Sequence, residues 1–117
     1  MARLSTHVLD TARGKPAAEM LVQLFSLSSG ARTLLKSCAT NADGRTPEPL
    51  LAADSIPAGV YELVFGVGAY FRASGDALPR PAFLEEVVVR FGVADSGGNY
   101  HVPLLVSPYG YSTYRGS

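Results

Sequence analysis

The sequence predicts an all-β protein, an antiparallel β-sandwich of seven to eight strands with one short helix. Three observations predict this class: short alternating runs of apolar and polar residues recur, clusters of turn-forming residues separate them, and a single segment has the character of a helix. A chain of 117 residues can remove about two-thirds of its unfolded surface from water. We therefore expect one domain over residues 1–117.

The first half of the chain predicts three strands. Leu4–Asp10 alternates so that His7 shares a face with Ser5 and Leu9, while the positions between them point the other way. Further strands are expected at Met20–Ser28, with both faces mostly covered, and at Ala31–Thr40, joined by a turn at Ser29-Gly30.

The middle of the chain predicts a loop, two more strands and the helix. Asn41–Pro47 is dense in turn formers, Leu50-Leu51 is a short edge strand, and Val60–Gly66 alternates as a central strand. The helix is expected at Val67–Ser74, before Gly75, and a prolyl loop then leads to a strand at Glu86–Val93.

The end of the chain predicts a β-hairpin. Ser107-Pro108-Tyr109-Gly110 suits a type I turn, and pairing of Ser107 with Gly110 places His101 opposite Gly116. A three-residue bulged loop would instead slip this register by one. In the first register the core face carries Tyr100, Val102, Leu104, Val106, Tyr111 and Thr113, and the outward face carries His101, Pro103, Leu105, Ser112, Tyr114 and Gly116.

Three motifs, in this order along the chain, resemble those of one family. They are LSTHVLDTARGKPA at residues 4–17, Asn41-Ala42-Asp43-Gly44-Arg45, and the closing Tyr114-Arg115-Gly116-Ser117. Together they resemble the transthyretin-like proteins that hydrolyse 5-hydroxyisourate in purine breakdown. The resemblance spans essentially the whole chain. It implies the transthyretin fold and a homotetramer in which active sites lie at subunit interfaces.

The composition narrows the partners. Ten Lys and Arg residues balance ten Asp and Glu, so the net charge attracts neither nucleic acid nor an anionic membrane. The single Cys38 excludes an internal disulfide and fits a reducing compartment, and no apolar run is long enough to span a membrane. We expect a cytoplasmic protein whose partner is a small molecule.

The two histidines, His7 and His101, are the candidate acid–base groups. Histidine titrates near neutral pH, so it can take a proton from water or give one to a leaving nitrogen, as hydrolysis of a cyclic amide requires. A histidine in a strand is more often a packed, hydrogen-bonded residue, and the motif match favours catalysis. Two histidines make a poor metal site, and zinc would need a third ligand, for example from another subunit. We expect no metal and no cofactor.

Arg45 and the C-terminal tetrapeptide are the candidate substrate-binding groups. Arg45 could orient a carbonyl-rich ring and stabilise an oxyanion, although a loop arginine is usually a solvated charge. Tyr114 offers a phenol on the His101 face, and Gly116 leaves space beside the imidazole. Arg115 has the same two interpretations as Arg45, and it could simply pair with the terminal carboxylate of Ser117. The resemblance adds Ser117 to the catalytic set.

The outward face of the first strand and the hairpin carries Leu9, Pro103, Leu105 and Tyr114. It is too apolar for a surface that faces water, so another subunit is expected to cover it.

The resemblance implies that water adds across the cyclic amide of 5-hydroxyisourate, on the route from urate to allantoin. Either histidine could be the general base. Two alternatives stay open: a small-molecule carrier that keeps the fold without catalysis, and an interaction module that uses the apolar face for docking. The histidines and the Tyr-Arg-Gly-Ser ending favour the enzyme over both.

Overall fold

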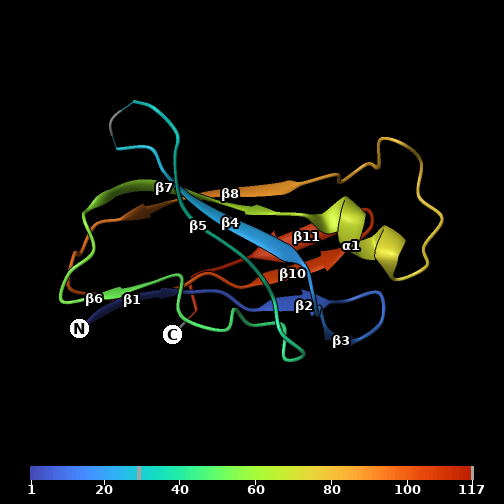
Figure 1. Ribbon diagram of the computed structural model, residues 1–117, viewed down its shortest axis with the longest axis horizontal. Coiled ribbons are helices and arrows are strands. Elements are labelled where there is room, and N and C mark those ends of the chain that lie inside the picture. Colours follow the sequence, from blue (N-terminus) through green and yellow to red (C-terminus); the bar gives the residue numbers. More distant parts are fainter. Residues whose placement is uncertain (29, 117) are drawn as a thin grey trace.

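The computed structural model describes residues 1–28 and 30–116 and shows two packed layers of strands with one helix at one end (Figure 1). One layer is a four-stranded antiparallel sheet in the order β5-β4-β7-β8. Its strands are β4 (Leu21–Ser26), β5 (Thr33–Ala39), β7 (Gly59–Phe65) and β8 (Val87–Val93), and the helix α1 (Val67–Ala73) follows β7.

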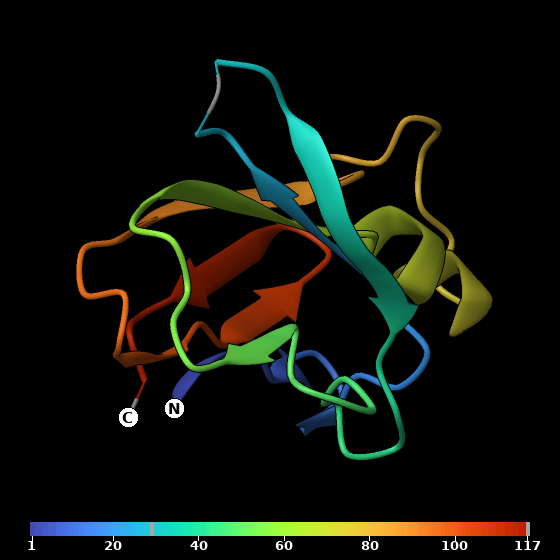
Figure 2. The same ribbon diagram turned by 60° about the vertical axis from the view of Figure 1, so that its left-hand side comes forward.

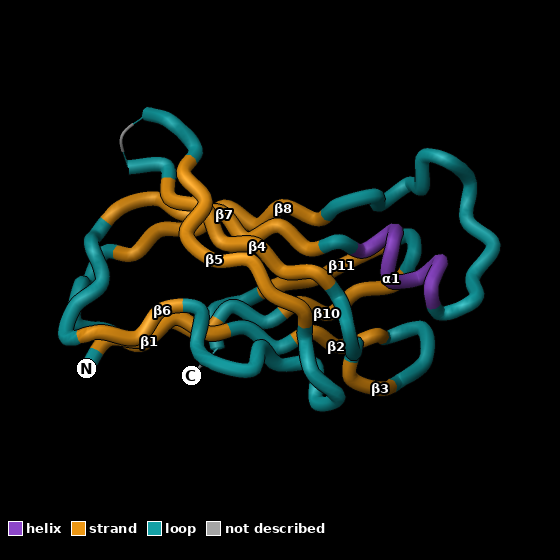
Figure 3. Tube along the Cα trace, viewed as in Figure 1, coloured by secondary structure: helices purple, strands orange, loops and turns teal. Residues whose placement is uncertain are grey.

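The other layer contains two shorter sheets, in the orders β6-β1-β9 and β11-β10-β2-β3. The tube in Figure 3 shows β1 running on toward β2 along this layer. These strands are β1 (Ala2–Ser5), β2 (Val8–Asp10), β3 (Lys15–Pro16), β6 (Leu51–Ala53), β9 (Asn99–His101), β10 (Leu104–Ser107) and β11 (Gly110–Thr113).

The predicted strand Leu4–Asp10 is divided, because Thr6 and His7 lie between β1 and β2. Its alternation is nevertheless confirmed: Leu4, Thr6 and Val8 are buried, whereas His7 is only partly so. The Thr6 hydroxyl donates to the carbonyl of Val102 at 2.7 Å, which satisfies a polar group inside the core. The described residues form eleven strands, more than the predicted seven to eight, mainly because β1/β2 and β9/β10 are interrupted strands.

The predicted antiparallel β-sandwich is confirmed, and the interrupted strands add two parallel pairs to it. β1 runs parallel to β9, and β2 runs parallel to β10. Every other strand pair of the described residues is antiparallel. The N-terminal segment thus inserts beside the C-terminal one, and the two ends of the chain lie on the same side of the molecule (Figure 2).

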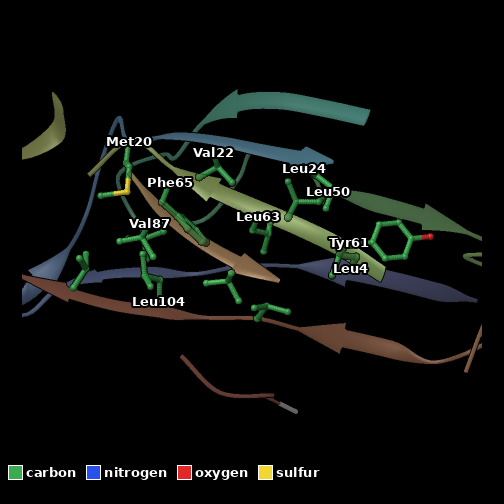
Figure 4. Close-up of a cluster of buried hydrophobic side chains, with 14 of the residues drawn as sticks. Leu4, Met20, Val22, Leu24, Leu50, Tyr61, Leu63, Phe65, Val87 and Leu104 are labelled. Carbon is green, nitrogen blue, oxygen red and sulfur yellow. The ribbon is translucent and has the colours of Figure 1, made fainter. Parts of the chain in front are cut away.

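The core fills the space between the layers (Figure 4). In β7, the predicted central strand, Tyr61, Leu63 and Phe65 are at most 2 % exposed. The predicted helix, edge strand and β8 are also present within a few residues of their expected bounds. Both faces of β4 were predicted to be mostly covered, and this prediction is wrong at Leu21, which is 47 % exposed.

The terminal hairpin has the predicted register, with Ser107 opposite Gly110 and an isolated bridge between His101 and Gly116. The prediction that Tyr111 and Thr113 belong to the core is wrong, because both are exposed. They lie on β11, an edge strand, and Thr113 lines an open groove of about 200 Å³ against β8. The position of β11 at the edge of its sheet leaves these side chains exposed, although the Thr113 hydroxyl donates to the Pro103 carbonyl at 2.7 Å.

The predicted apolar outward face is present with one correction. Leu9 and Leu105 are registered side by side on β2 and β10 and are both partly exposed, and Tyr114 is 59 % exposed. Pro103 is buried and so does not belong to this face. It lies where the chain passes between β9 and β10, at a break in the ladder.

Candidate active site

His7 lies at the junction of β1 and β2, against the loop that carries Arg45. The two residues form an isolated antiparallel bridge, and the Val8 amide donates to the Gly44 carbonyl at 2.8 Å. The Nε2 atom of His7 is 2.9 Å from the carbonyl oxygen of Asp43. A carbonyl oxygen only accepts, so Nε2 of His7 carries a proton that it donates to Asp43.

The Asn41–Arg45 loop is built around the Asn41 side chain. Its Oδ1 accepts from the amides of Asp43 at 2.9 Å and Arg45 at 3.2 Å, and the Asn41 amide donates to the Arg45 carbonyl at 2.7 Å. Gly44 has φ +76°, and a Cβ there would lie 2.4 Å from the Val8 carbonyl oxygen. Only glycine therefore allows the loop to dock on the strand that carries His7.

His101 ends β9 and is oriented by β1. Its Nδ1 is 2.8 Å from the Ser5 hydroxyl, which lies opposite it in the parallel ladder. Burial, followed by the positive charges of Arg45 and His7, lowers the pKa of His101 below its ordinary value of 6.5. The imidazole is therefore neutral at pH 7. Arg45 lines the same cleft as His101, and His7 is bridged to Arg45.

The C-terminal segment packs against His101 through Gly116. The Gly116 amide donates to the His101 carbonyl at 2.7 Å, and a Cβ at residue 116 would lie 2.6 Å from Cδ2 of the ring. Arg115 donates to the Asn99 carbonyl at 3.3 Å, and its guanidinium lies 4.3 Å from the ring centroid of Tyr100. The expectation for Ser117 falls outside the described residues.

These residues border an open cleft of about 380 Å³. Of the predicted site residues, Arg45 and His101 line it directly, and His7 adjoins it through its bridge with Arg45. Tyr114 and Arg115 instead line the apolar groove beside β8, so one subunit does not bring them into this cleft. The full lining is Arg3, Ser5, Arg45, Asn99, Tyr100 and His101.

The sequence predictions missed Arg3, Ser5, Asn99 and Tyr100 as cleft residues. The signal for the first two was present, because the alternation that faces His7 outward also places Arg3 and Ser5 on its side of the strand. Arg3 is registered opposite Asn99, and Ser5 opposite His101. A pair of parallel strands thus presents four polar side chains as one surface.

The electrostatics of the cleft suit a ligand rich in carbonyl groups or negative charge. Its lining contains two guanidinium groups, on Arg3 and Arg45, and no carboxylate side chain. Over residues 1–28 and 30–116, no group of three or more His, Cys, Asp or Glu side chains is placed to hold a metal ion. In the same residues, no helix has the length and apolar character needed to cross a membrane.

Comparison with known proteins identifies relatives over the full length of the chain. A model of the HIUase/Transthyretin family matches residues 4–116. The 5-hydroxyisourate hydrolase of Mesorhizobium japonicum is 61 % identical over 115 residues, which cover 98 % of this chain and 92 % of that protein. The 5-hydroxyisourate hydrolase of Ralstonia nicotianae is 56 % identical over 117 residues and all of both chains.

Solved structures agree with this relationship. (S)-Allantoin synthase superposes with a TM-score of 0.92 at 41 % identity, over 99 % of this chain but 44 % of that one. Klebsiella pneumoniae 5-hydroxyisourate hydrolase gives a TM-score of 0.83 at 35 % identity over all of both chains. Transthyretin from Sparus aurata gives 0.85 at 28 % identity, over 97 % of this chain and 96 % of the other. Because the family model covers nearly the whole chain and full-length relatives exceed half identity, this protein belongs to the HIUase/Transthyretin family.

Proposed function

We propose that this protein is an enzyme that hydrolyses 5-hydroxyisourate, opening its cyclic amide in the degradation of urate to allantoin. One observation carries the proposal: His7, Arg45 and His101 converge at one cleft in a chain whose full-length relatives at 56 and 61 % identity are named for this reaction. Residues 1–117 then form a single hydrolase domain. The reaction uses a small-molecule substrate and this chain's own side chains, with no cofactor.

In this mechanism His101 is the general base. Its lowered pKa keeps the ring neutral and able to accept a proton at pH 7. Water attacks the amide carbonyl directly as His101 takes its proton, and no acyl-enzyme forms. The C–N bond of the substrate then breaks and a carboxylate forms. The leaving nitrogen of the substrate receives the proton from His101. His7, held by the Asp43 carbonyl, is the second acid–base group.

Arg45 binds the substrate and stabilises the negative charge of the tetrahedral intermediate. The Asn41 hydrogen bonds hold its backbone, while its side chain makes no hydrogen bond or ion pair within the part of the chain that the structure describes. A guanidinium on a fixed backbone, with no partner among the described residues, can donate two parallel hydrogen bonds to a carbonyl-rich ring. This arrangement supports a binding role over that of a solvated surface charge.

The C-terminal segment completes the site in the proposal. Gly116 leaves room for the His101 ring. Tyr114, Arg115, Gly116 and Ser117 bind substrate in the assembled protein, where Tyr114 and Arg115 reach a cleft that one subunit does not bring them into. Ser117 is also assigned to the catalytic set. Deleting Gly116 and Ser117 should abolish turnover with little change in thermal stability, because about one cross-strand pair is lost. Unchanged turnover in the deleted protein, and in protein extended after Ser117, would show that the tail is only structural.

The assembly in the proposal is a homotetramer with sites at subunit interfaces. It is supported by the partly exposed apolar pair Leu9 and Leu105 and by the exposed ring of Tyr114, on the layer that also bears the cleft. Docking of another subunit on this face would bring a second copy next to each cleft. We also propose a cytoplasmic location, which agrees with a single cysteine. A monomer by light scattering at micromolar concentration would contradict the shared site.

The test is the decay of freshly generated 5-hydroxyisourate, followed by its ultraviolet absorbance with and without the protein. The proposal expects a decay rate that increases in proportion to protein concentration. A carrier would bind the compound and leave its spontaneous decay unaccelerated, and an interaction module would do neither. Thus an unaccelerated decay with the intact, folded chain would overturn the enzyme assignment.

A further inference from the structure

We propose that Ser5 is a positioning residue: its hydroxyl accepts a hydrogen bond from Nδ1–H of His101 and so directs Nε2 of that ring to the substrate. The inference rests on the proposed function, because it assigns a task to a residue beside the proposed base. Its first support is the register. Ser5 and His101 are 96 residues apart in sequence but directly opposite in the parallel pair of β1 and β9.

The backbone around this pair is held on both sides. The Val102 amide donates to the Ser5 carbonyl at 2.9 Å, and the Thr6 hydroxyl donates to the Val102 carbonyl at 2.7 Å. Because Thr6 is buried and alternation turns its neighbour outward, the Ser5 side chain is directed to the face that carries His101. The 2.8 Å contact between Oγ and Nδ1 is therefore a product of fixed backbone geometry.

The His101 ring is confined at two positions. Nδ1 is bonded to Ser5, and the Cδ2 edge lies against Gly116, where even a Cβ would come within 2.6 Å. The Nε2 and Cε1 atoms remain on the side of the cleft, and no other hydrogen bond to this ring is present among the described residues. Nε2 is thus the nitrogen available to water or substrate.

The chemistry of a hydroxyl suits this position. Catalysis at Nε2 needs Nδ1 to keep its proton while Nε2 takes a proton from water and later gives it up. A serine oxygen accepts from Nδ1–H in both states of the ring. Because a hydroxyl carries no charge, it raises the pKa of a histidine less than a carboxylate would. Among the described residues, the charged or titratable side chains that line the cleft with His101 are Arg3, Arg45 and Tyr100, and His7 adjoins it. Burial, followed by Arg45 and His7, lowers the pKa of His101, so the base stays neutral near pH 7.

The experiment compares Ser5→Ala, Ser5→Thr and Ser5→Asp with the unaltered enzyme, and uses Ser37→Ala as the matched control, since Ser37 is an exposed serine of β5 in the other layer. Ser5→Ala should lower kcat by at least about 10-fold, a part of the effect of an acid–base group, with a smaller change in KM. Ser5→Thr should restore most of the rate. Ser5→Asp should move the acidic limb of the pH–rate profile to higher pH, because a carboxylate raises the pKa of a neighbouring imidazole.

A spectroscopic measurement separates this inference from the proposed function. The chain has two histidines, so the ring nitrogens of His101 can be assigned by ¹⁵N NMR after His7→Asn. In the protein with Ser5, the His101 ring should be the tautomer protonated at Nδ1. Ser5→Ala should shift that ring toward protonation at Nε2. An Nε2-protonated ring in both proteins, or a Ser5→Ala enzyme with full kcat, would overturn the inference. The tautomer is measured without turnover, so inactivity of the unaltered chain would contradict only the proposed function.

Discussion

The N-terminal motif contributes to two polar centres that differ in how completely their groups are paired. At the first, the carboxylate of Asp10 is fully buried and accepts from the Arg13 amide at 3.0 Å, the Arg13 guanidinium at 3.2 Å and the Tyr70 hydroxyl at 2.8 Å. The Arg13 guanidinium also forms an ion pair with the Asp76 carboxylate, with an N···O distance of 2.9 Å. This centre links β2 to helix α1 and to the loop that follows the helix, and it gives the carboxylate three hydrogen-bond donors.

The second centre is the cleft of His101 and Arg45, where hydrogen bonds fix the residues but leave some of their polar atoms without a partner. His101 is bonded through Nδ1 alone and Arg45 through its backbone, within the residues described. Burial also acts in opposite ways: it is the main cause that raises the pKa of Tyr70, which stays a donor, and that lowers the pKa of His101, which stays a base. Complete pairing characterises the structural centre, and incomplete pairing characterises the proposed active site.

The largest expected effect is on activity at the second centre. His101→Asn and His7→Asn should each lower kcat by about 100- to 10,000-fold, because each removes a group that transfers a proton. The melting temperature should change little, since neither side chain belongs to the buried core. Steady-state kinetics and thermal denaturation check both statements, and full activity in either variant would reassign that histidine to packing.

The second effect is on stability at the first centre. Asp10→Ala should lower the free energy of unfolding by about 3 kcal/mol, because it leaves the buried Tyr70 hydroxyl and the Arg13 guanidinium without their shared acceptor. Urea denaturation measures this loss. Asp95→Ala is the control, because Asp95 is an exposed carboxylate in the turn before β9, and it should lower the free energy of unfolding less. If the Asp10 variant were as stable as the unaltered protein but inactive, the contrast between the two centres would fail.

A third prediction tests the fit of the tail against His101. Gly116→Ala places a methyl group where the ring now lies, and a displacement of about 1 Å can cost up to about 100-fold in rate. Gly110→Ala, in the same hairpin, is the matched control, because the nearest atom to its Cβ is the Ser107 hydroxyl at 3.8 Å. Kinetics should separate the two alanines, and equal activity would show that the ring moves aside without consequence.

The smallest effect concerns pH and His101. The pKa of this group is lower in the folded chain than its unfolded value of 6.5, so the unfolded chain binds the proton first as the pH falls. The contribution of His101 to stability should therefore be fully present above pH 6.5 and decline between pH 6.5 and its folded pKa. Urea midpoints at pH 7.5 and pH 5 measure this decline, which should be smaller in His101→Asn. Equal declines in both proteins would contradict it.

Features that depend on neighbours along the chain could be predicted from the sequence. Alternation placed His7 and Leu4 on opposite faces, the Ser107–Gly110 turn set the hairpin register, and that register carried Gly116 to His101. These features follow from dihedral preferences and from the two-residue period of a strand, which act over a few residues. The motifs named the three site residues that the structure brings together.

Which distant segments lie side by side could be seen only in the tertiary structure. It brought β1 parallel to β9, which joined Ser5 to His101, and it docked the Arg45 loop on His7. It also left Tyr111 and Thr113 exposed, against the pattern of their strand. The reason is that such pairings depend on how much apolar surface the whole core buries, and no local sequence period encodes that balance.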